Sequence, residues 1–226
     1  MKRIVTAGAK GGVGKSTAAL NLTGALTRFA VELVDLDPSS SLTLAMMGES
    51  HPDPIHAERY PLPWADVRPQ VGTFRPSGRT MVRASRWDMR EHLRAQPNIE
   101  VQIVDLPPTL DERALEAVLM ADLVLVPLSP QPLDLPSLWD VLEVVRQLKA
   151  KAPVRALLNR VQSRRSIVGQ VIEAIDQEAP GVLLKTMIPE DVRVAEAPGA
   201  SLPVEIYAPT SRGAEAYRAL AKEIMR

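Results

Sequence analysis

The chain has 226 residues, of which 46% are apolar and 24% charged, a composition that excludes a disordered or fibrous protein. Because 27 Lys and Arg residues balance 27 Asp and Glu residues, any surface for nucleic acid or membrane must be a local patch. The absence of cysteine excludes disulfides and cysteine-ligated clusters and favours a reducing cytoplasm. The length suits one domain, which we expect to cover residues 1–226.

Short aliphatic runs alternate with longer helical patterns, which is the order of elements in a parallel sheet covered by helices on both faces. The expected strands are rich in Val, Ile and Leu without clean alternation, as strands buried on both faces should be. They cover residues 3–7, 32–36, 101–106, 123–128, 154–158 and 182–188. The expected helices cover residues 15–29, 111–120, 135–149, 167–178 and 211–225. Ser166 and Thr210 are the expected N-caps of the last two. The sequence therefore predicts an α/β fold with a mostly parallel central sheet.

Residues 51–78 differ from the rest of the chain, because they are rich in proline and show little periodicity. We expect an irregular excursion on the surface of the domain rather than a linker between domains. After it, Ser85 and Asp88 have the spacing of a capping box, which predicts a helix that ends before Pro97.

The clearest chemical signal is the run Lys-Gly-Gly-Val-Gly-Lys-Ser-Thr at residues 10–17, between the first expected strand and the first expected helix. A Gly-rich turn at this place lets backbone N–H groups face an anion at a helix N-terminus. Lys15 would reach the β- and γ-phosphates of a nucleotide, and the Ser16 hydroxyl would hold Mg²⁺. A strict Walker A pattern requires glycine where this chain has Ala9, and an additional lysine, Lys10, opens the loop. The run predicts nucleotide binding of a deviant Walker A type, the alternative being a turn that merely joins strand to helix.

Two of the expected strands end in acidic residues. Asp35 and Asp37 close the second strand, Asp105 closes the third, and a proline follows within two residues in both cases. Since the carboxyl ends of parallel strands meet at one edge of the sheet, these carboxylates would lie beside the phosphate loop, where Mg²⁺ and an attacking water must be held. A single aspartate at such a place is more often a helix cap, but two such strand ends in a chain with a phosphate loop favour a functional role.

These motifs resemble the deviant Walker A ATPases of the ParA/MinD family, and within it the ParA-type partition ATPases. The resemblance covers nearly the whole chain outside residues 51–78. It is carried by residues 10–17 (the deviant Walker A loop), 35–38 (the second motif), 104–108 (the Walker B strand), 121–127 (the next strand), 157–160 (the strand whose Asn reads adenine), and 188–197 and 214–224 (the C-terminal stretch). The resemblance implies a P-loop NTPase fold with ATP and Mg²⁺ as cofactors.

The resemblance also implies a role for each matching residue. Lys10 would cross a two-fold interface to the ATP phosphates of a second subunit, so that ATP drives homodimerisation. Asp37 would position the attacking water, and Asp105 would hold Mg²⁺ through water. Asn159 would hydrogen-bond adenine, with the backbone near Pro189 completing the pocket. The expected nucleotide-binding residues are Lys10, Gly11, Gly12, Val13, Gly14, Lys15, Ser16, Thr17, Asn159 and Pro189, the catalytic residues Lys10, Lys15 and Asp37, and the metal-binding residues Ser16, Asp37 and Asp105.

Two positions depart from the family pattern. Ser39, Ser40 and Ser41 stand where the family often has Gln-Gly-Asn, and Leu106 replaces a small hydroxyl residue. Both departures put the rate of hydrolysis in question more than nucleotide binding. The chain begins at the first expected strand, so we expect a short form without a helix-turn-helix domain. We expect no membrane contact either, because no amphipathic extension follows the last expected helix.

The resemblance implies a cytoplasmic, nucleoid-associated ATPase that dimerises with ATP and binds DNA non-specifically. It would segregate plasmid or chromosomal DNA with a centromere-binding partner that stimulates hydrolysis. The candidate DNA contacts are basic residues of the C-terminal region and of the loop after Asn159, namely Arg193, Arg212, Arg218, Lys222, Arg164 and Arg165. Two alternatives stay open. The first is positioning of a protein cargo through an adaptor, because no motif specifies the cargo. The second is a small-molecule P-loop ligase, which Lys10 disfavours because a monomeric enzyme does not need it.

Overall fold

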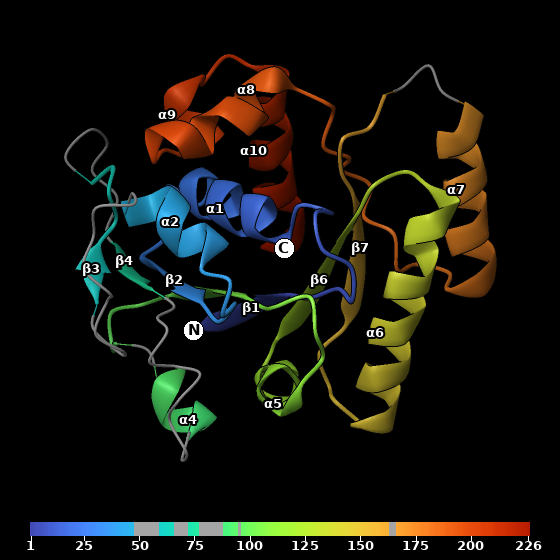
Figure 1. Ribbon diagram of the computed structural model, residues 1–226, viewed down its shortest axis with the longest axis horizontal. Coiled ribbons are helices and arrows are strands. Elements are labelled where there is room, and N and C mark those ends of the chain that lie inside the picture. Colours follow the sequence, from blue (N-terminus) through green and yellow to red (C-terminus); the bar gives the residue numbers. More distant parts are fainter. Residues whose placement is uncertain (48–58, 66–71, 77–87, 95, 163–165) are drawn as a thin grey trace.

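The strands form one sheet in the computed structural model, which describes residues 1–47, 59–65, 72–76, 88–94, 96–162 and 166–226. Within these residues the sheet has seven strands in the order β3-β4-β2-β5-β1-β6-β7 (Figure 1). The strands are β1 (Lys2–Thr6), β2 (Val31–Asp35), β3 (Tyr60–Pro61), β4 (Gly72–Arg75), β5 (Val101–Asp105), β6 (Leu123–Leu128) and β7 (Val154–Leu158). Neighbours are parallel, except that β3 pairs antiparallel with β4 at one edge. The predicted α/β fold with a mostly parallel sheet is confirmed.

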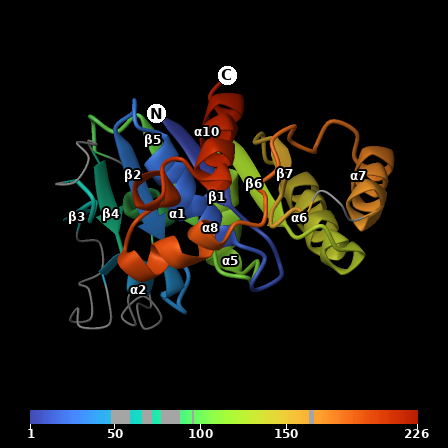
Figure 2. The ribbon, with the colours of Figure 1, turned by 90° about the horizontal axis from the view of Figure 1, so that it is seen from above.

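Helices cover both faces of this sheet, as the two ribbon views show (Figures 1 and 2). One face carries α1 (Lys15–Ala25), α2 (Ser41–Met47), α8 (Val192–Glu196), the 3₁₀ turn η2 (Ala197–Ala200), α9 (Val204–Tyr207) and α10 (Arg212–Ile224). The other face carries α4 (Met89–His92), α5 (Glu112–Leu119), α6 (Leu135–Gln147) and α7 (Ser166–Glu178), and the 3₁₀ turn η1 (Pro132–Asp134) leads into α6. In the described part of the chain, no helix has the length and apolar character needed to cross a membrane.

Successive residues of each strand point into two different hydrophobic cores. In β1, Ile4 packs into the core below α1 and α10, whereas Val5 packs into the core shared with α5 and α6. In the neighbouring β5, Ile103 and Val104 divide in the same way. Because burial of one such side chain contributes about 1.5–3 kcal/mol, apolar residues are favoured at every strand position. This explains why the strands show no alternation in the sequence.

Five of the six expected strands form within one residue of their expected ends, and the sixth prediction is wrong. Residues 182–188 run beside β7 but form only an isolated bridge at Leu183. The ladder is interrupted because the N–H groups of Lys185 and Thr186 donate to the Glu223 carboxylate of α10, at 2.8 and 2.9 Å. A side chain of another element thus takes the hydrogen bonds that a strand would need.

The expected helices all form, with ends that differ by at most four residues, but the predicted caps need correction. Ser211 rather than Thr210 caps α10, where its hydroxyl accepts from the N–H three residues on at 3.2 Å. Ser166 is the expected N-cap, which is the residue before a helix, but it is the first residue of α7 itself. Asp88 caps α4 itself, and its supposed capping-box partner Ser85 lies outside the described residues.

The expectation of an irregular surface excursion at residues 51–78 is wrong where the structure describes this segment. β3 and β4 belong to the sheet, and Leu62, Trp64 and Phe74 are buried in the same core as residues of α2. Strands of two and four residues are too short to show periodicity, and Pro61 fits an edge strand, where a missing N–H breaks no ladder. The single-domain interpretation of residues 1–226 stays a prediction.

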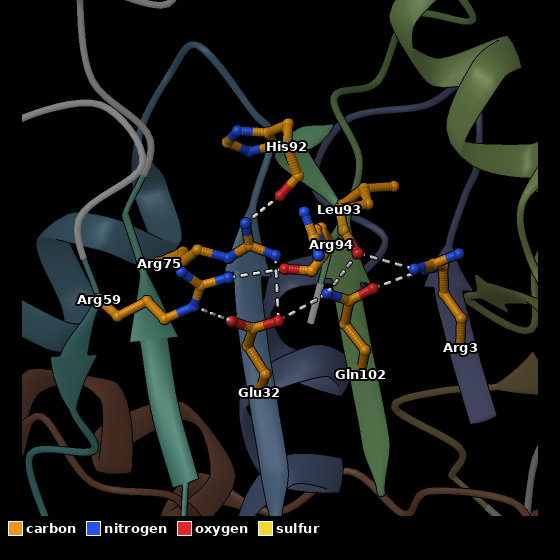
Figure 3. A network of polar contacts seen from close by, with 8 residues as sticks. All are labelled: Arg3, Glu32, Arg59, Arg75, His92, Leu93, Arg94 and Gln102. Carbon is orange, nitrogen blue, oxygen red and sulfur yellow. Dashed lines mark hydrogen bonds and ion pairs between the residues drawn. The ribbon is translucent and has the colours of Figure 1, made fainter. Parts of the chain in front are cut away.

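A buried polar cluster joins the amino ends of the central strands (Figure 3). Arg3 of β1, Gln102 of β5 and Glu32 of β2 are neighbours in strand register. The Glu32 carboxylate accepts from Arg59 Nε at 2.8 Å and from Arg75 Nη2 at 3.0 Å. It also accepts from Gln102 Nε2 at 2.6 Å, and Arg3 Nε donates to Gln102 Oε1 at 2.5 Å. We call these five residues the arginine cluster.

The arginine cluster also fixes the carboxyl end of α4. Its three guanidinium groups donate to three consecutive backbone carbonyl oxygens, those of residues 92, 93 and 94 (Figure 3). Burial lowers the pKa of Arg3 and of Arg75. The charges of Asp122 and then Glu32 oppose this effect on the pKa at Arg3, and the charge of Glu32 opposes it at Arg75. Charged hydrogen bonds therefore hold residues 88–94 against the sheet, far from the edge where the phosphate loop lies.

Candidate functional site

The phosphate loop, residues 10–17, lies at the carboxyl edge of the sheet between β1 and α1. Its backbone is left-handed at Gly12 (φ 77°) and at Gly14 (φ 99°), the N-cap of α1. A Cβ at residue 14 would lie 2.2 Å from Asn159 Nδ2, so both conformation and space require glycine there. A Cβ at Gly11 or Gly12 would meet no atom within 4 Å, so the backbone of this part of the loop is accessible to a ligand.

Lys15 is the buried cation of the loop. It is the first residue of α1, and its ammonium donates to the Lys10 carbonyl oxygen at 2.9 Å. Burial lowers the pKa of Lys15, while the charges of Asp105 and Asp37 raise it. A cation and a helix N-terminus at the same place favour the binding of an anion.

Asp105 ends β5 next to Thr6 and Asp35 in strand register. Its Oδ1 accepts from the Thr6 hydroxyl at 2.7 Å, whereas its Oδ2 is buried and has no hydrogen-bond partner among the described residues. Burial raises the pKa of Asp105 to about 6, against the opposing effect of the Ser16 and Thr6 hydroxyls. A buried acceptor without a donor costs about 1–3 kcal/mol. This oxygen therefore marks a place for a donor such as a metal-bound water.

Asp35 shapes the loop that follows β2. It is fully buried, and its Oδ1 accepts from the Asp37 N–H at 2.9 Å. Its Oδ2 accepts from the N–H and the hydroxyl of Thr43, at 2.9 and 2.7 Å. Burial, followed by the charge of Asp105, raises the pKa of Asp35 to about 8. Asp35 thus positions the backbone of Asp37, a role that depends on a contact with α2 and that the motif alone does not reveal.

Beside the loop lies a hollow of about 330 Å³, which we call the phosphate hollow, and the fully buried Asp35 and Asp105 do not line it. It is lined by Gly11, Gly12, Gly14, Lys15, Ser16, Thr17, Asp37, Ser39, Ser41, Pro108 and Arg160. The structure thus brings the predicted loop together with Asp37. Ser39 and Ser41, two of the residues that depart from the family pattern, also line it, with their hydroxyl oxygens 3.1 Å apart.

The phosphate hollow fits phosphate groups and a divalent cation. The accessible backbone at Gly11 and Gly12 and the ammonium of Lys15 suit an anion. The Ser16 hydroxyl and Asp105 Oδ2 are oxygen ligands of the kind that Mg²⁺ or its waters prefer. Among the described residues, no group of three or more His, Cys, Asp and Glu side chains could hold a metal alone.

Lys10 forms an ion pair within its own chain. Its ammonium donates to the Asp134 carboxylate at the start of α6. Asp134 is buried and also accepts from the Ser129 N–H at 3.2 Å, while the Lys10 side chain is 46% exposed. Sequence reasoning missed Asp134, because a Pro-Leu-Asp turn before a helix looks like an ordinary cap. In the structure, Asp134 makes no such cap hydrogen bond.

Asn159 contacts the phosphate loop from the end of β7. Its Nδ2 donates to the Val13 carbonyl at 3.1 Å, and its Oδ1 accepts from the Arg160 N–H at 3.0 Å. A second hollow, of about 470 Å³, lies on this side of the site, and we call it the β7 hollow. It is lined by Ser129, Pro130, Gln131, Pro132, Leu133, Arg160, Gln162, Ile167 and Glu190. Pro189 itself forms a bridge to Val161, so its proposed contact with adenine stays a prediction.

The described candidate DNA contacts differ in their present partners. Arg193 and Arg218 are ion-paired with glutamates, at 2.8 and 2.6 Å. Arg212 donates to a backbone carbonyl at 3.4 Å, and Lys222 is exposed. Residues 164–165 lie outside the described part of the chain. The DNA contact therefore stays a prediction, with two of its arginines already bound to acidic side chains.

Comparison with known proteins identifies similar chains. A family profile described as "CobQ/CobB/MinD/ParA nucleotide binding domain" matches residues 4–204. The chain is 32% identical over 241 residues to the chromosome-partitioning ATPase Soj of Thermus thermophilus, covering 100% of this chain and 96% of that protein. Its fold is similar to that of the ATP complex of a McdA variant from Cyanothece, with a TM-score of 0.82, 20% identity, and coverage of 100% and 96%. It is also similar to that of the cobyrinic acid a,c-diamide synthase of Mycobacterium smegmatis with a bound ATP analog and magnesium, with a TM-score of 0.80, 23% identity, and coverage of 100% and 94%.

Proposed function

Since the chain belongs to the CobQ/CobB/MinD/ParA nucleotide-binding family, we propose that it binds ATP with Mg²⁺ in the phosphate hollow and hydrolyses the ATP. The observation that carries the proposal is the unpartnered Oδ2 of Asp105 at the end of a strand beside the phosphate loop. Two proteins of the same fold support it, one bound to ATP and one to an ATP analog with magnesium.

Each polar residue of the site has a part in this proposal. Lys15 binds the β- and γ-phosphates, and the Ser16 hydroxyl holds the cation, with Asp105 contributing through a water. Bound Mg²⁺ would neutralise charge on the phosphates. The Asp37 carboxylate, positioned by Asp35, orients the water that attacks the γ-phosphate. The base lies beside Asn159, in the β7 hollow.

Nucleotide titrations with and without Mg²⁺ test this assignment. Asp105→Asn should lose most of the gain in ATP affinity that Mg²⁺ provides, and should keep the affinity measured in EDTA. Asp140→Asn, which changes an exposed aspartate of α6, is the matched control and should behave as the unmodified chain. If Asp105→Asn responds to Mg²⁺ like the control, Asp105 does not hold the cation.

We further propose that ATP drives homodimerisation through Lys10. Its ammonium must exchange the Asp134 carboxylate for phosphates bound to a second copy of the chain, so the γ-phosphate couples assembly to the nucleotide. Analytical ultracentrifugation with a slowly hydrolysed ATP analog should show a dimer. Lys10→Ala should bind the analog but stay monomeric, whereas Lys151→Ala, at an exposed lysine before β7, should dimerise normally. A Lys10→Ala protein that still dimerises rules out this role.

The process served by this cycle, in our proposal, is segregation of plasmid or chromosomal DNA on the nucleoid with a centromere-binding partner that stimulates hydrolysis. The full-length similarity to a chromosome-partitioning ATPase supports it. Because the chain carries no net charge, one subunit should bind DNA weakly, and a dimer that joins two weak sites should gain avidity. The contacts would reach phosphates from the C-terminal basic residues, so binding should ignore sequence and fall steeply with salt.

Gel shifts on unrelated duplexes, with and without ATP over a salt series, test DNA binding. We expect retardation only with ATP, equal on all sequences. Retardation that is equally strong without nucleotide would separate DNA binding from the ATP switch. Absence of binding in every state would favour the alternative, an ATPase that positions a protein cargo through an adaptor. The likeness to a diamide synthase keeps a ligase as a second alternative, for which a small molecule should stimulate hydrolysis.

A further inference from the structure

Two hollows meet at the carboxyl edge of the sheet, and one residue lines both of them. The phosphate hollow is formed by the loop and Asp37, and the β7 hollow by residues after β6 and β7. Among the described residues that line them, Arg160 alone is common to the two. A ligand with its phosphates in the first hollow and another part in the second must therefore pass Arg160.

The backbone at Arg160 is held in a conformation that side chains other than glycine seldom adopt. Its φ is 56°, in the left-handed region, which is strained for a residue with a side chain. Hydrogen bonds on both sides fix it. The Arg160 N–H donates to Asn159 Oδ1 at 3.0 Å, and the next N–H, of Val161, donates to the Ile188 carbonyl at 2.9 Å. The chain thus turns at the end of β7, and the turn brings the Arg160 side chain to the junction of the hollows.

The guanidinium of Arg160 also differs from the other arginines described above. Those of the arginine cluster share the Glu32 carboxylate or bind carbonyls, and Arg193 and Arg218 pair with glutamates. Arg160 is exposed, and no ion pair joins it to a carboxylate within the part of the chain that the structure describes. It is therefore free to bind an anion that enters the site.

We propose that Arg160 binds the α-phosphate and the adjoining sugar of the nucleotide. Lys15, Asp37 and Asp105 locate the terminal phosphates, so the group nearest the β7 hollow is the one that links phosphate to sugar. A guanidinium can donate two parallel hydrogen bonds to phosphate oxygens, which suits this position. The proposal rests on the nucleotide binding proposed above and is independent of dimerisation and of DNA.

Calorimetric titration with ATP, ADP and pyrophosphate tests the assignment. Arg160→Asn is the main variant, because asparagine tolerates the left-handed backbone, and Arg160→Lys keeps the charge without the paired donors. Arg28→Ala removes an exposed arginine beyond the other end of α1 and is the control. A hydrogen bond to a charged group contributes about 1.5–3 kcal/mol. Arg160→Asn should therefore lower the affinities for ATP and for ADP by one and the same factor, about tenfold or more. Arg160→Lys should recover part of the loss, and pyrophosphate affinity should be unchanged.

The outcomes separate this inference from the function on which it rests. If the unmodified chain binds none of the nucleotides, the proposed function and the role of Arg160 are both wrong. If it binds them and Arg160→Asn binds ADP equally well, only the role of Arg160 is wrong. If Arg160→Asn lowers the affinity for pyrophosphate as much as the affinity for ADP, Arg160 binds the terminal phosphates, and its proposed contact with the α-phosphate and sugar is wrong.

Discussion

Buried ionisable groups gather at both ends of the neighbouring strands β1, β2 and β5, and the two ends differ in which kind of group is in excess. At the amino ends, three guanidinium groups accompany the Glu32 carboxylate, and the Asp122 carboxylate also lies beside Arg3, so guanidinium groups still outnumber carboxylates. At the carboxyl ends, Asp35, Asp37 and Asp105 accompany a single ammonium, that of Lys15. One cluster has an excess of positive groups and the other an excess of acidic groups.

The chain balances only the first of these excesses. The guanidinium groups donate to the carbonyls of residues 92, 93 and 94, and Arg75 Nε is the only buried side-chain atom of the cluster without a partner among the described residues. At the carboxyl edge, hydroxyl and N–H groups satisfy Asp35 and one oxygen of Asp105, but Oδ2 stays without a donor. Each cluster thus keeps one buried atom without a partner among the described residues, but only the atom at the carboxyl edge, Asp105 Oδ2, lies beside an anion site, where it indicates a cation.

The largest expected effect concerns the arginine cluster at the amino ends of the strands. Glu32→Gln removes the carboxylate from a buried cluster and leaves its arginines uncompensated, so the free energy of unfolding should fall by about 3–5 kcal/mol. Urea denaturation measures the change, and ATP affinity should be unaffected because the cluster lies at the opposite edge. Glu143→Gln, in an exposed pair with Arg146, is the control and should change the free energy of unfolding far less than Glu32→Gln does. Equal effects of the two variants would show that the arginine cluster does not stabilise the fold.

A somewhat smaller effect concerns the pH dependence of the other end. The folded chain holds a proton on Asp105 up to about pH 6, whereas the ordinary pKa is 3.8, so between these values the folded state binds more protons than the unfolded state. The free energy of unfolding should therefore decline as pH rises from 3.8 to about 6, by about 3 kcal/mol at most. The raised pKa of Asp35 extends the decline toward pH 8.

Asp105→Asn should remove its share of that decline. We expect the variant to be more stable than the unmodified chain above pH 6, with a difference that shrinks as pH falls toward 4. Thermal denaturation of the nucleotide-free proteins at several pH values measures it. If stability changes with pH in the same way for the two proteins, burial does not disfavour the charged form of Asp105.

The contrast between the ends also explains how far the sequence predicts this molecule. Residues 10–17 and the aspartates that end β2 and β5 are local sequence patterns. In the structure they lie where these patterns predict, between β1 and α1 and at the strand ends. β3 and β4 escape prediction because their few residues are stabilised by burial of Trp64 and Phe74 rather than by periodicity. Thr43, which donates to Asp35, and Asp134, which pairs with Lys10, belong to other parts of the fold, so no spacing in the chain reveals these contacts.

The third prediction separates ligand binding from folding. Lys15→Ala should lower ATP affinity by on the order of 100-fold, because two charge-assisted contacts to phosphates are lost. The free energy of unfolding without ATP should change much less than in Glu32→Gln, since Lys15 serves the ligand more than the fold. Titration calorimetry and urea denaturation of the same samples check both statements, with Lys151→Ala as control. If Lys15→Ala strongly lowers the free energy of unfolding but keeps its ATP affinity, Lys15 serves the fold and not the ligand, contrary to the role assigned to it.

The smallest effect concerns Asp134, a buried carboxylate that shares features of both clusters. It is balanced, as Glu32 is, but its cation belongs to the phosphate loop and is half exposed, so that cation can leave. If Lys10 must exchange Asp134 for the phosphates of a second subunit, the ion pair opposes dimerisation. Asp134→Asn keeps an acceptor for the Ser129 N–H and removes the charge that holds Lys10.

Because such an ion pair contributes about 1 kcal/mol or less and a dimer exchanges one pair in each subunit, Asp134→Asn should lower the dimer dissociation constant by up to about fivefold per subunit, which is about 30-fold in all. Sedimentation equilibrium with a slowly hydrolysed ATP analog measures this, and monomer affinity for the analog should not change. Asp140→Asn on the same helix controls for the loss of one negative charge. A weaker dimer in Asp134→Asn than in this control would mean that Asp134 holds Lys10 ready for the second subunit rather than away from it. The pair would then belong with the acidic end of the sheet, as part of the binding apparatus.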